Sequence, residues 1–204
     1  MDQVLAFLGA LDVRLMFFFN GTIHNPMFNW VMPIFHDGKV WLIPLVLAWA
    51  AAMVKGDKRL RIVAGLCLAV VLLTDQVSSS LIKPLAARIR PCNVLGGLHL
   101  WKDGAWMITP DPVIKIYKDS FSFPSSHAAN AGGQAFWWSW AYPRTRWFWM
   151  VLAFLIGYSR VYDGVHYPFD VLAGWTVGGL CFGVVWYLAG RRWVKVRPSL
   201  SPRD

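Results

Sequence analysis

Six long apolar segments limit the folds open to this 204-residue chain more than any other feature of its sequence. The longest of them match the ~20 residues that a helix needs to cross ~30 Å of hydrocarbon. The shorter ones need neighbouring residues to complete a span. We therefore predict an all-α integral membrane protein, a bundle of about six transmembrane helices at residues 4–19, 40–54, 62–82, 128–142, 147–162 and 171–189.

The composition agrees with lipid as the surrounding solvent. Hydrophobic residues make up 56% of the chain and the mean hydropathy is +0.42, above the usual values for a soluble domain. Thirteen tryptophans suit a protein with many residues at the bilayer interface. The formal charge of +9 comes without a basic helix or a nucleic-acid motif. We therefore expect no nucleic-acid partner and attribute the charge to membrane topology and to an anionic substrate.

Charged residues leave two arrangements open for the first segment. Asp12 and Arg14 interrupt it, so it either crosses the membrane or lies along the surface as an amphipathic helix. The chain shows no repeat or coiled-coil heptad, and its start shows no cleavable signal peptide. We expect one membrane-embedded domain over residues 1–204, with a first span or interfacial helix within 1–36 and a basic cytoplasmic tail at 190–204.

Lysines and arginines in the short connections predict the orientation of the bundle. Alternating spans put three basic clusters on one face, which the positive-inside rule makes cytoplasmic. The long segment 83–127 and the turn 164–168 then share the outer face. The three clusters are Lys55, Lys58, Arg59 and Arg61; Arg144 and Arg146; and Arg191, Arg192, Lys195, Arg197 and Arg203.

Cysteine and glycine spacings add little to the functional argument. Cys67, Cys92 and Cys181 show neither metal-ligand spacing nor a disulfide framework, so we interpret them as two buried hydrophobes and a loop thiol. G-x-x-x-G spacings at 174–178 and 179–183 permit close helix contact, with packing inside one chain favoured over dimerisation. The oligomeric state stays open.

The turn between the fifth and sixth segments holds the residues best suited to chemistry. The stretch 159–170, S-R-V-Y-D-G-V-H-Y-P-F-D, contains a cation (Arg160), an imidazole (His166) and a carboxylate (Asp170). A helix starting near Pro168 would hold Asp170 close beneath His166. The carboxylate could then bond one imidazole nitrogen and leave the other nucleophilic. An ordinary turn is the alternative; a metal pair lacks a third ligand, so we expect no metal.

The end of the third segment carries a second polar group. Asp75, Ser79 and Lys83 are spaced four residues apart, so a helix stacks them on one face. Asp75 either orients Lys83 or satisfies a neighbouring helix. Taken alone, Lys83 and Arg90 could simply be cations that reach the membrane interface.

A third group, Pro124-Ser125-Ser126-His127, opens the fourth segment. Successive backbone N–H groups at a helix start form an anion site. His127 beside them could donate a proton to a leaving oxygen. The alternative is a serine N-cap followed by a histidine at the interface.

The three groups share the outer face and together contain the parts that phosphoryl transfer requires. That reaction depends on positioning and on neutralising charge at phosphate oxygens. The parts are three cations (Lys83, Arg90, Arg160), a backbone cradle, two histidines (His127, His166) and a carboxylate (Asp170).

These motifs have a counterpart in a known family. K-x6-R-P at 83–91, P-S-S-H at 124–127 and S-R-x5-H-x3-D at 159–170 resemble the three-part signature of the type 2 phosphatidic acid phosphatase superfamily, which includes vanadium haloperoxidases. The ordered trio is very specific and covers about residues 75–170. One departure is Ser126, where the commonest family pattern has glycine; the backbone N–H is the group that matters there.

The resemblance implies a lipid phosphatase that needs neither a metal nor another cofactor. His166 would attack phosphorus and form a phosphohistidine, with Asp170 orienting its ring. His127 would protonate the leaving group and later activate water. The phosphate oxygens would be held by Lys83, Arg90, Arg160 and the N–H groups near Ser125 and Ser126.

A site at the outer face favours a lipid phosphate as substrate, in a bacterial inner membrane with the site facing the periplasm. Undecaprenyl diphosphate is our first choice; phosphatidylglycerol phosphate, phosphatidic acid and lipid A phosphates are the rivals. The alternative functions are phosphotransfer from a polyprenyl diphosphate, a vanadate haloperoxidase and a non-enzymatic lipid-phosphate transporter. Trp101 and Trp106 either border a lipid entrance or belong to a cap over the bundle.

Overall fold

A computed structural model describes residues 2–118 and 120–194, and most of these residues are helical. The α-helices are α1 (Asp2–Phe17), α2 (Pro26–His36), α3 (Gly38–Lys55), α4 (Lys58–Asp75), α5 (Lys83–Ala86), α6 (Ser126–Ala141), α7 (Arg146–Tyr162), α8 (Pro168–Val185) and α9 (Arg191–Trp193). Three π-helical turns extend or join them, at Phe18–Thr22, Gln76–Ile82 and Trp186–Gly190. A hairpin of β1 (His99–Lys102) and β2 (Ala105–Ile108) and two 3-10 turns, Pro91–Asn93 and Pro143–Thr145, complete the elements.

All six predicted apolar segments are helical, which confirms the all-α membrane class. Three helices in the described residues are long and apolar enough to cross a membrane: Asp2–Thr22, Lys58–Ala86 and Pro168–Trp193. The pair Pro26–His36 and Val40–Lys55, bent by 53°, makes a fourth if it counts as one span. Helices α6 and α7 have only 16 and 17 residues. The total of six spans stays a prediction.

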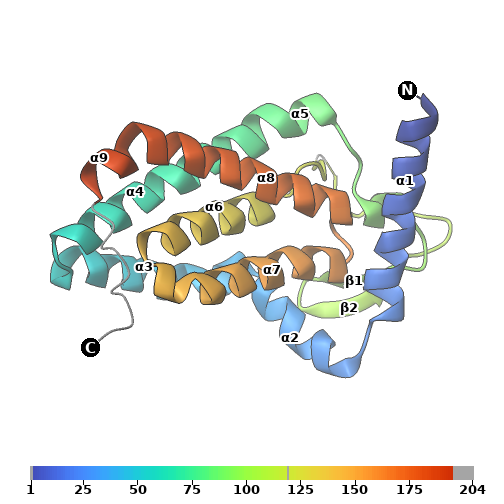
Figure 1. The fold of residues 1–204 in the computed structure, drawn as a ribbon. Coiled ribbons are helices and arrows are strands. Elements are labelled where there is room, and N and C mark those ends of the chain that lie inside the picture. Colours follow the sequence, from blue (N-terminus) through green and yellow to red (C-terminus); the bar gives the residue numbers. More distant parts are fainter. Residues whose placement is uncertain (1, 119, 195–204) are drawn as a thin grey trace, which may run out of the picture.

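Helices α4, α6, α7 and α8 form the bundle (Figure 1). Glycines on α8 let its backbone approach α6: a Cβ at Gly174 would lie 2.5 Å from the Ser125 carbonyl oxygen, and one at Gly178 would lie 2.3 Å from that of Ala129. The first G-x-x-x-G spacing therefore packs helices within one chain, as we favoured. Only glycine permits so close an approach.

Two apolar clusters stabilise the two ends of the bundle. One, around the fully buried Trp137, joins α4, α6 and α8 far from the predicted site. The other cluster lies next to the predicted site and consists of Met16, Leu98, Ala128, Val161, Tyr167 and Val171. Large apolar side chains also cover the outside, such as Ile43 at 68% and Phe154 at 56% exposure, and lipid is the solvent that suits them.

Helix α1 runs crosswise to the bundle, at the end where α8 begins (Figure 1). Residues 2–10 are exposed, whereas Asp12 and Met16 are buried against the rest of the protein. The length of the helix would permit a membrane crossing. Its direction, however, favours the other arrangement, a helix along the membrane surface.

The long segment after α5 covers the same end of the bundle. Trp106 of the hairpin donates a hydrogen bond of 3.1 Å to the Asn29 carbonyl of α2, and its ring packs edge-on against Tyr162. These contacts favour the cap over the lipid entrance as the role of Trp106. The predicted basic tail falls mainly on residues 195–204, outside the described part of the chain.

Candidate active site

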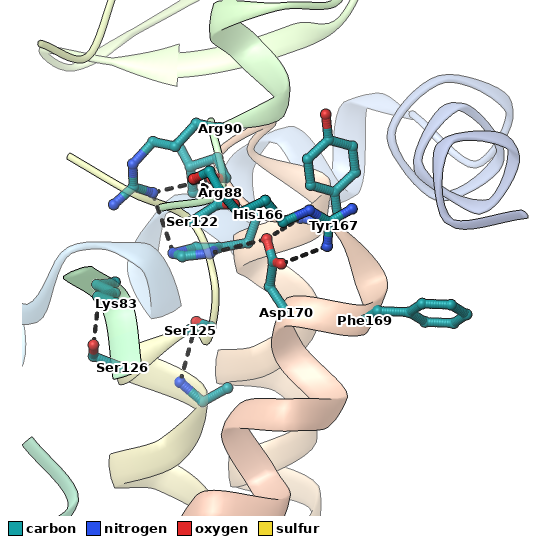
Figure 2. A network of polar contacts seen from close by, with 12 residues as sticks. Lys83, Arg88, Arg90, Ser122, Ser125, Ser126, His166, Tyr167, Phe169 and Asp170 are labelled. Carbon is teal, nitrogen blue, oxygen red and sulfur yellow. Dashed lines mark hydrogen bonds and ion pairs between the residues drawn. The ribbon is translucent and has the colours of Figure 1, made fainter. Parts of the chain in front are cut away.

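The three predicted motif groups meet at one end of the bundle, where α6 and α8 begin and α5 and α7 end (Figures 1 and 2). Helix α8 starts at Pro168, as predicted, and Asp170 lies in its first turn. Asp170 Oδ2 accepts a hydrogen bond of 2.9 Å from the Tyr167 N–H. A carboxylate at this position satisfies an otherwise unpaired N–H at the helix start.

The turn before α8 is held tightly, so His166 has a defined position. The N–H groups of Val165 and His166 both bond to the Arg160 carbonyl, at 3.2 and 3.1 Å. Gly164 has a φ of 80°, and a Cβ there would lie 2.5 Å from the His99 carbonyl oxygen, so only glycine lets β1 back the turn this closely.

His166 is 2% exposed and lies between a cation and a carboxylate. Its Nε2 is 3.2 Å from Arg90 Nη1, and its Nδ1 is 3.5 Å from Asp170 Oδ2. Burial, followed by the charges of Arg90, Arg160 and Lys83, holds the pKa of His166 well below its ordinary value of 6.5. A neutral ring that accepts from Arg90 at Nε2 has its proton on Nδ1, facing Asp170.

Arg90 is fixed on several sides. Nη1 also donates to the Val165 carbonyl at 3.0 Å, and Nε and Nη2 donate to Ser120 Oγ at 3.2 and 2.9 Å. The guanidinium lies 5.3 Å from the ring centre of Tyr117. A planar cation held in this way is preorganised for an anion.

Lys83 is oriented through serine hydroxyls. Its Nζ donates to Ser126 Oγ at 2.9 Å, which in turn lies 2.9 Å from Ser79 Oγ (Figure 2 shows the Lys83–Ser126 contact). Ser79 Oγ bonds to Asp75 Oδ1 at 3.1 Å. The predicted shared helix face is confirmed, and this chain of hydroxyls connects Asp75 to Lys83.

Ser125 caps α6, with its Oγ accepting from the Ala128 N–H at 3.4 Å. Its own N–H donates to the Asp170 carbonyl at 2.9 Å, which ties the starts of α6 and α8 together. The Ser125 N–H is thus already occupied. The N–H groups of Ser126 and His127, which begin the helix, remain for an anion.

The other two predicted site residues reach the same region without direct contact to Asp170 among the described residues. His127 has an exposed side chain on the first turn of α6, and its Nε2 faces Gly38 at the start of α3. Arg160, 7% exposed, donates from Nη1 to the His36 carbonyl at 2.9 Å. Its Nε is buried and has no acceptor in the described part of the chain.

Three polar pairs were not predicted from the sequence. Arg88 pairs with both Asp170 and Asp12, each at 2.7 Å, and His36 Nδ1 lies 2.9 Å from Asp163 Oδ2. A charged residue inside an apolar segment was the available signal for Asp12, because such residues normally face a polar partner. Arg88 and Asp163 carried no comparable signal.

These helices define a multi-pass membrane protein, which gathers a cluster of cations and histidines at one end. Residues 64–193 match the PAP2 superfamily model, so the chain belongs to the PAP2 superfamily. It is a membrane lipid phosphatase of that type.

Named relatives extend over most of the chain. A lipid A 4′-phosphatase from Bacteroides thetaiotaomicron is 31% identical over 192 residues, 91% of this chain and 80% of the relative. Phosphatidylglycerophosphatase B from Bacillus subtilis is 30% identical, covering 80% of this chain and 76% of the relative. An undecaprenyl-diphosphatase from Sulfolobus acidocaldarius is 32% identical over 56% of this chain and 50% of the relative.

A solved structure shares the fold. The crystal structure of the first transmembrane PAP2 type phosphatidylglycerolphosphate phosphatase from Bacillus subtilis has a TM-score of 0.64 and 25% identity. The match covers 90% of this chain and 87% of that chain.

Proposed function

We propose that the chain hydrolyses a lipid phosphate through a phosphohistidine formed on His166. The observation that carries this proposal is the position of its ring: Nε2 lies beside Arg90 and Nδ1 faces Asp170. A buried imidazole with a carboxylate 3.5 Å from Nδ1 is placed to act as an activated nucleophile, because the carboxylate stabilises the charge that the ring gains.

In the first step, Nε2 of His166 attacks phosphorus and the bond from phosphorus to the lipid oxygen breaks. The charge of Arg160, with burial, lowers the pKa of His127, so this ring is neutral in the free protein. It takes up a proton when the anionic substrate binds and donates that proton to the leaving oxygen. The imidazole becomes positively charged as the N–P bond forms, and Asp170, opposite the Nδ1 proton, stabilises this charge.

In the second step, His127, now neutral, takes a proton from a water molecule whose oxygen attacks the phosphohistidine. The N–P bond breaks, and its electron pair returns to Nε2 of His166. Inorganic phosphate leaves, with both histidines back in their starting states. The same residue serves as acid and then as base, as microscopic reversibility requires.

The proposed phosphate ligands are Lys83, Arg90 and Arg160, with the N–H groups of Ser126 and His127. The buried Arg160 Nε lacks an acceptor among the described residues, and a bound phosphate oxygen would supply one. Three fixed cations neutralise oxygen charge as a metal ion would, which supports a metal-independent reaction.

Two cavities beside Arg90 support an amphipathic substrate. One, of about 510 Å³, has a mainly apolar lining that includes Ile89, Val113 and Phe121, and it also touches Ser120, which holds Arg90. It would take the start of a lipid tail.

The second cavity, of about 410 Å³, is lined by aromatic and polar side chains that include Trp101, Lys102, Tyr117 and His36. Tyr117 contacts Arg90, and the His36 carbonyl accepts from Arg160, so this cavity also adjoins the proposed phosphate site. Such a lining suits a polar head group that carries hydroxyls, because aromatic rings pack against it while polar groups bond to it.

We accordingly test a lipid A type phosphate first, ahead of undecaprenyl diphosphate, our first choice among the substrates of the family. A lipid A 4′-phosphatase that matches 91% of this chain supports this order. The positive-inside distribution supports a site facing the periplasm from a bacterial inner membrane.

The test uses purified protein in detergent with EDTA and a panel of lipid A, phosphatidylglycerol phosphate, phosphatidic acid and undecaprenyl diphosphate. We expect release of inorganic phosphate, retained with EDTA and abolished by His166→Ala. Full activity in that variant, or a metal requirement, would contradict the mechanism. Transfer of phosphate to an added lipid in preference to water would indicate a phosphotransferase, and binding without turnover a transporter.

A further inference from the structure

Asp12 is the one carboxylate of helix α1 that the described structure buries completely, at 0% exposure. Both of its oxygens are used. Oδ2 accepts from Arg88 Nη2 at 2.7 Å, and Oδ1 accepts from the Phe169 N–H at 2.9 Å. A charge buried in an apolar helix is costly unless its partners are well placed, so these contacts call for an explanation.

Arg88 connects Asp12 to the carboxylate that faces His166. Its Nη1 donates to Asp170 Oδ1 at 2.7 Å, while its guanidinium lies 3.9 Å from the ring centre of Tyr167 (Figure 2 shows Arg88, Tyr167 and Asp170). The other oxygen of Asp170 accepts from the Tyr167 N–H and lies nearest His166. One guanidinium is therefore shared between two carboxylates.

We propose that Asp12 is a positioning residue for His166, acting through Arg88 and through the first turn of α8. This inference rests on the proposed function of His166. Asp12 bonds to two groups that position Asp170. One is the Arg88 guanidinium, which also bonds to Asp170 Oδ1, and the other is the backbone N–H of Phe169, the residue before Asp170. It thereby sets both the place and the effective charge of the Asp170 carboxylate.

Sharing one guanidinium between two carboxylates changes the charge that each carboxylate presents to its surroundings. With Asp12 ionised, Arg88 divides its positive charge between two anions, and Asp170 keeps much of its negative field at His166. Without the Asp12 charge, Arg88 neutralises Asp170 alone. The imidazole then becomes harder to charge during attack on phosphorus, so the chemical step slows.

The contacts of Asp12 also predict that its loss will not affect KM. The described contacts of Asp12 go to Arg88 and Phe169, whereas the proposed phosphate ligands are Lys83, Arg90 and Arg160. Substrate binding should therefore change little. Loss of an interaction that is made only in the transition state lowers kcat and leaves KM unchanged.

The central experiment compares Asp12→Asn with Asp2→Asn in the full-length protein in detergent, on the lipid phosphate that is turned over fastest. Asparagine can keep the bond from Phe169 but removes the charge. We expect Asp12→Asn to lower kcat about 10-fold or more with KM within about twofold. Asp2 lies on the exposed end of the same helix, so Asp2→Asn is the matched control and should behave like the wild type.

A second pair of variants separates positioning from simple docking of α1. In an Arg88→Gln background, Asp12→Asn should lower kcat less than about twofold further. The charge of Asp12 reaches Asp170 through Arg88, which is already removed, and asparagine can keep the bond from Phe169. Asp12→Glu, which restores the charge, should recover most of the activity. It also provides the test if Asp12→Asn yields no folded protein.

Four outcomes would overturn the inference while leaving the phosphatase proposal intact. They are a wild-type kcat in Asp12→Asn, a raised KM with kcat unchanged, no recovery of activity in Asp12→Glu, and equal losses of kcat in both backgrounds. A wild-type protein that releases no phosphate, or a fully active His166→Ala, would instead overturn the proposed function and this inference with it.

Discussion

The Lys83 ammonium donates a hydrogen bond of 2.9 Å to the hydroxyl of Ser126, at the motif position where the commonest family pattern has glycine. The same hydroxyl contacts Ser79 at 2.9 Å. In this chain the Ser126 hydroxyl therefore accepts one of the hydrogen bonds of Lys83, a cation that we assign to phosphate binding. A phosphate oxygen has to share Lys83 with it.

Ser126→Ala should consequently strengthen the binding of phosphate. Removing the hydroxyl frees Lys83 for the anion, and we expect the inhibition constant of orthophosphate to fall about two- to fivefold. Inhibition of lipid phosphate turnover by added orthophosphate measures it. Ser139→Ala, at the opposite end of α6, is the control, since Ser139 bonds only to the Arg146 carbonyl among the described contacts. Weaker inhibition in Ser126→Ala would show that the hydroxyl itself helps to bind phosphate.

The pH profile should report the charges around His166. Its pKa is lowered by burial first and then by Arg90, Arg160 and Lys83, so the ring is neutral above a pH well below 6.5. Activity that depends on the neutral ring is lost only as the pH falls through that lowered value. Arg90→Gln removes one positive charge, which raises the pKa of His166 and moves the acidic limb of kcat/KM to higher pH.

The comparison of the two profiles on one substrate cancels the ionisation of the substrate itself. Lys58→Gln serves as the control, because Lys58 is exposed at the start of α4, at the opposite end of the bundle (Figure 1). An acidic limb that stays in place in Arg90→Gln would contradict this assignment.

The apolar cavity beside Arg90 should matter only for substrates with long chains. Val113→Ser places a hydroxyl in that cavity, and we expect turnover of a long-chain lipid phosphate to fall about threefold or more, since apolar burial is lost. A water-soluble phosphate ester should be turned over at the wild-type rate. Measuring both substrates with one preparation provides the test.

Trp106→Ser provides the contrast for that experiment. Trp106 holds the hairpin to α2, so its loss should lower turnover of both substrates to a similar extent. A selective loss of long-chain turnover in Trp106→Ser, with no such loss in Val113→Ser, would indicate that the lipid enters beside the hairpin.

Close packing between α6 and α8 predicts a stability difference between two glycines of one helix. A Cβ at Gly178 would lie 2.3 Å from the Ala129 carbonyl oxygen, whereas one at Gly183 would meet no atom within 4 Å. Gly178→Ala should cost about 1–3 kcal/mol through overpacking, and Gly183→Ala should be neutral or stabilising. Thermal unfolding in detergent measures both variants. Equal melting temperatures would argue against this packing.

Much of the fold followed from the sequence because its signals are local. Apolar length marks each of the six helical segments, and Pro168 marks the start of α8. The motif residues could be assigned to one end of the bundle because alternating spans place their segments there. Their mutual distances could not be assigned in this way, since these depend on how the helices tilt and pack.

The chain alone determined the lipid surroundings, the helices and the residues suited to phosphate chemistry, because hydropathy and short motifs are written in neighbouring residues. Tertiary structure alone decided that α1 lies across the bundle, that Ser126 holds Lys83 and that Arg88 joins Asp12 to Asp170. The two Arg88 pairs link residues 76 and 82 positions apart in the sequence. Pairing over such separations leaves no local pattern, and only the packed bundle brings those charges into contact.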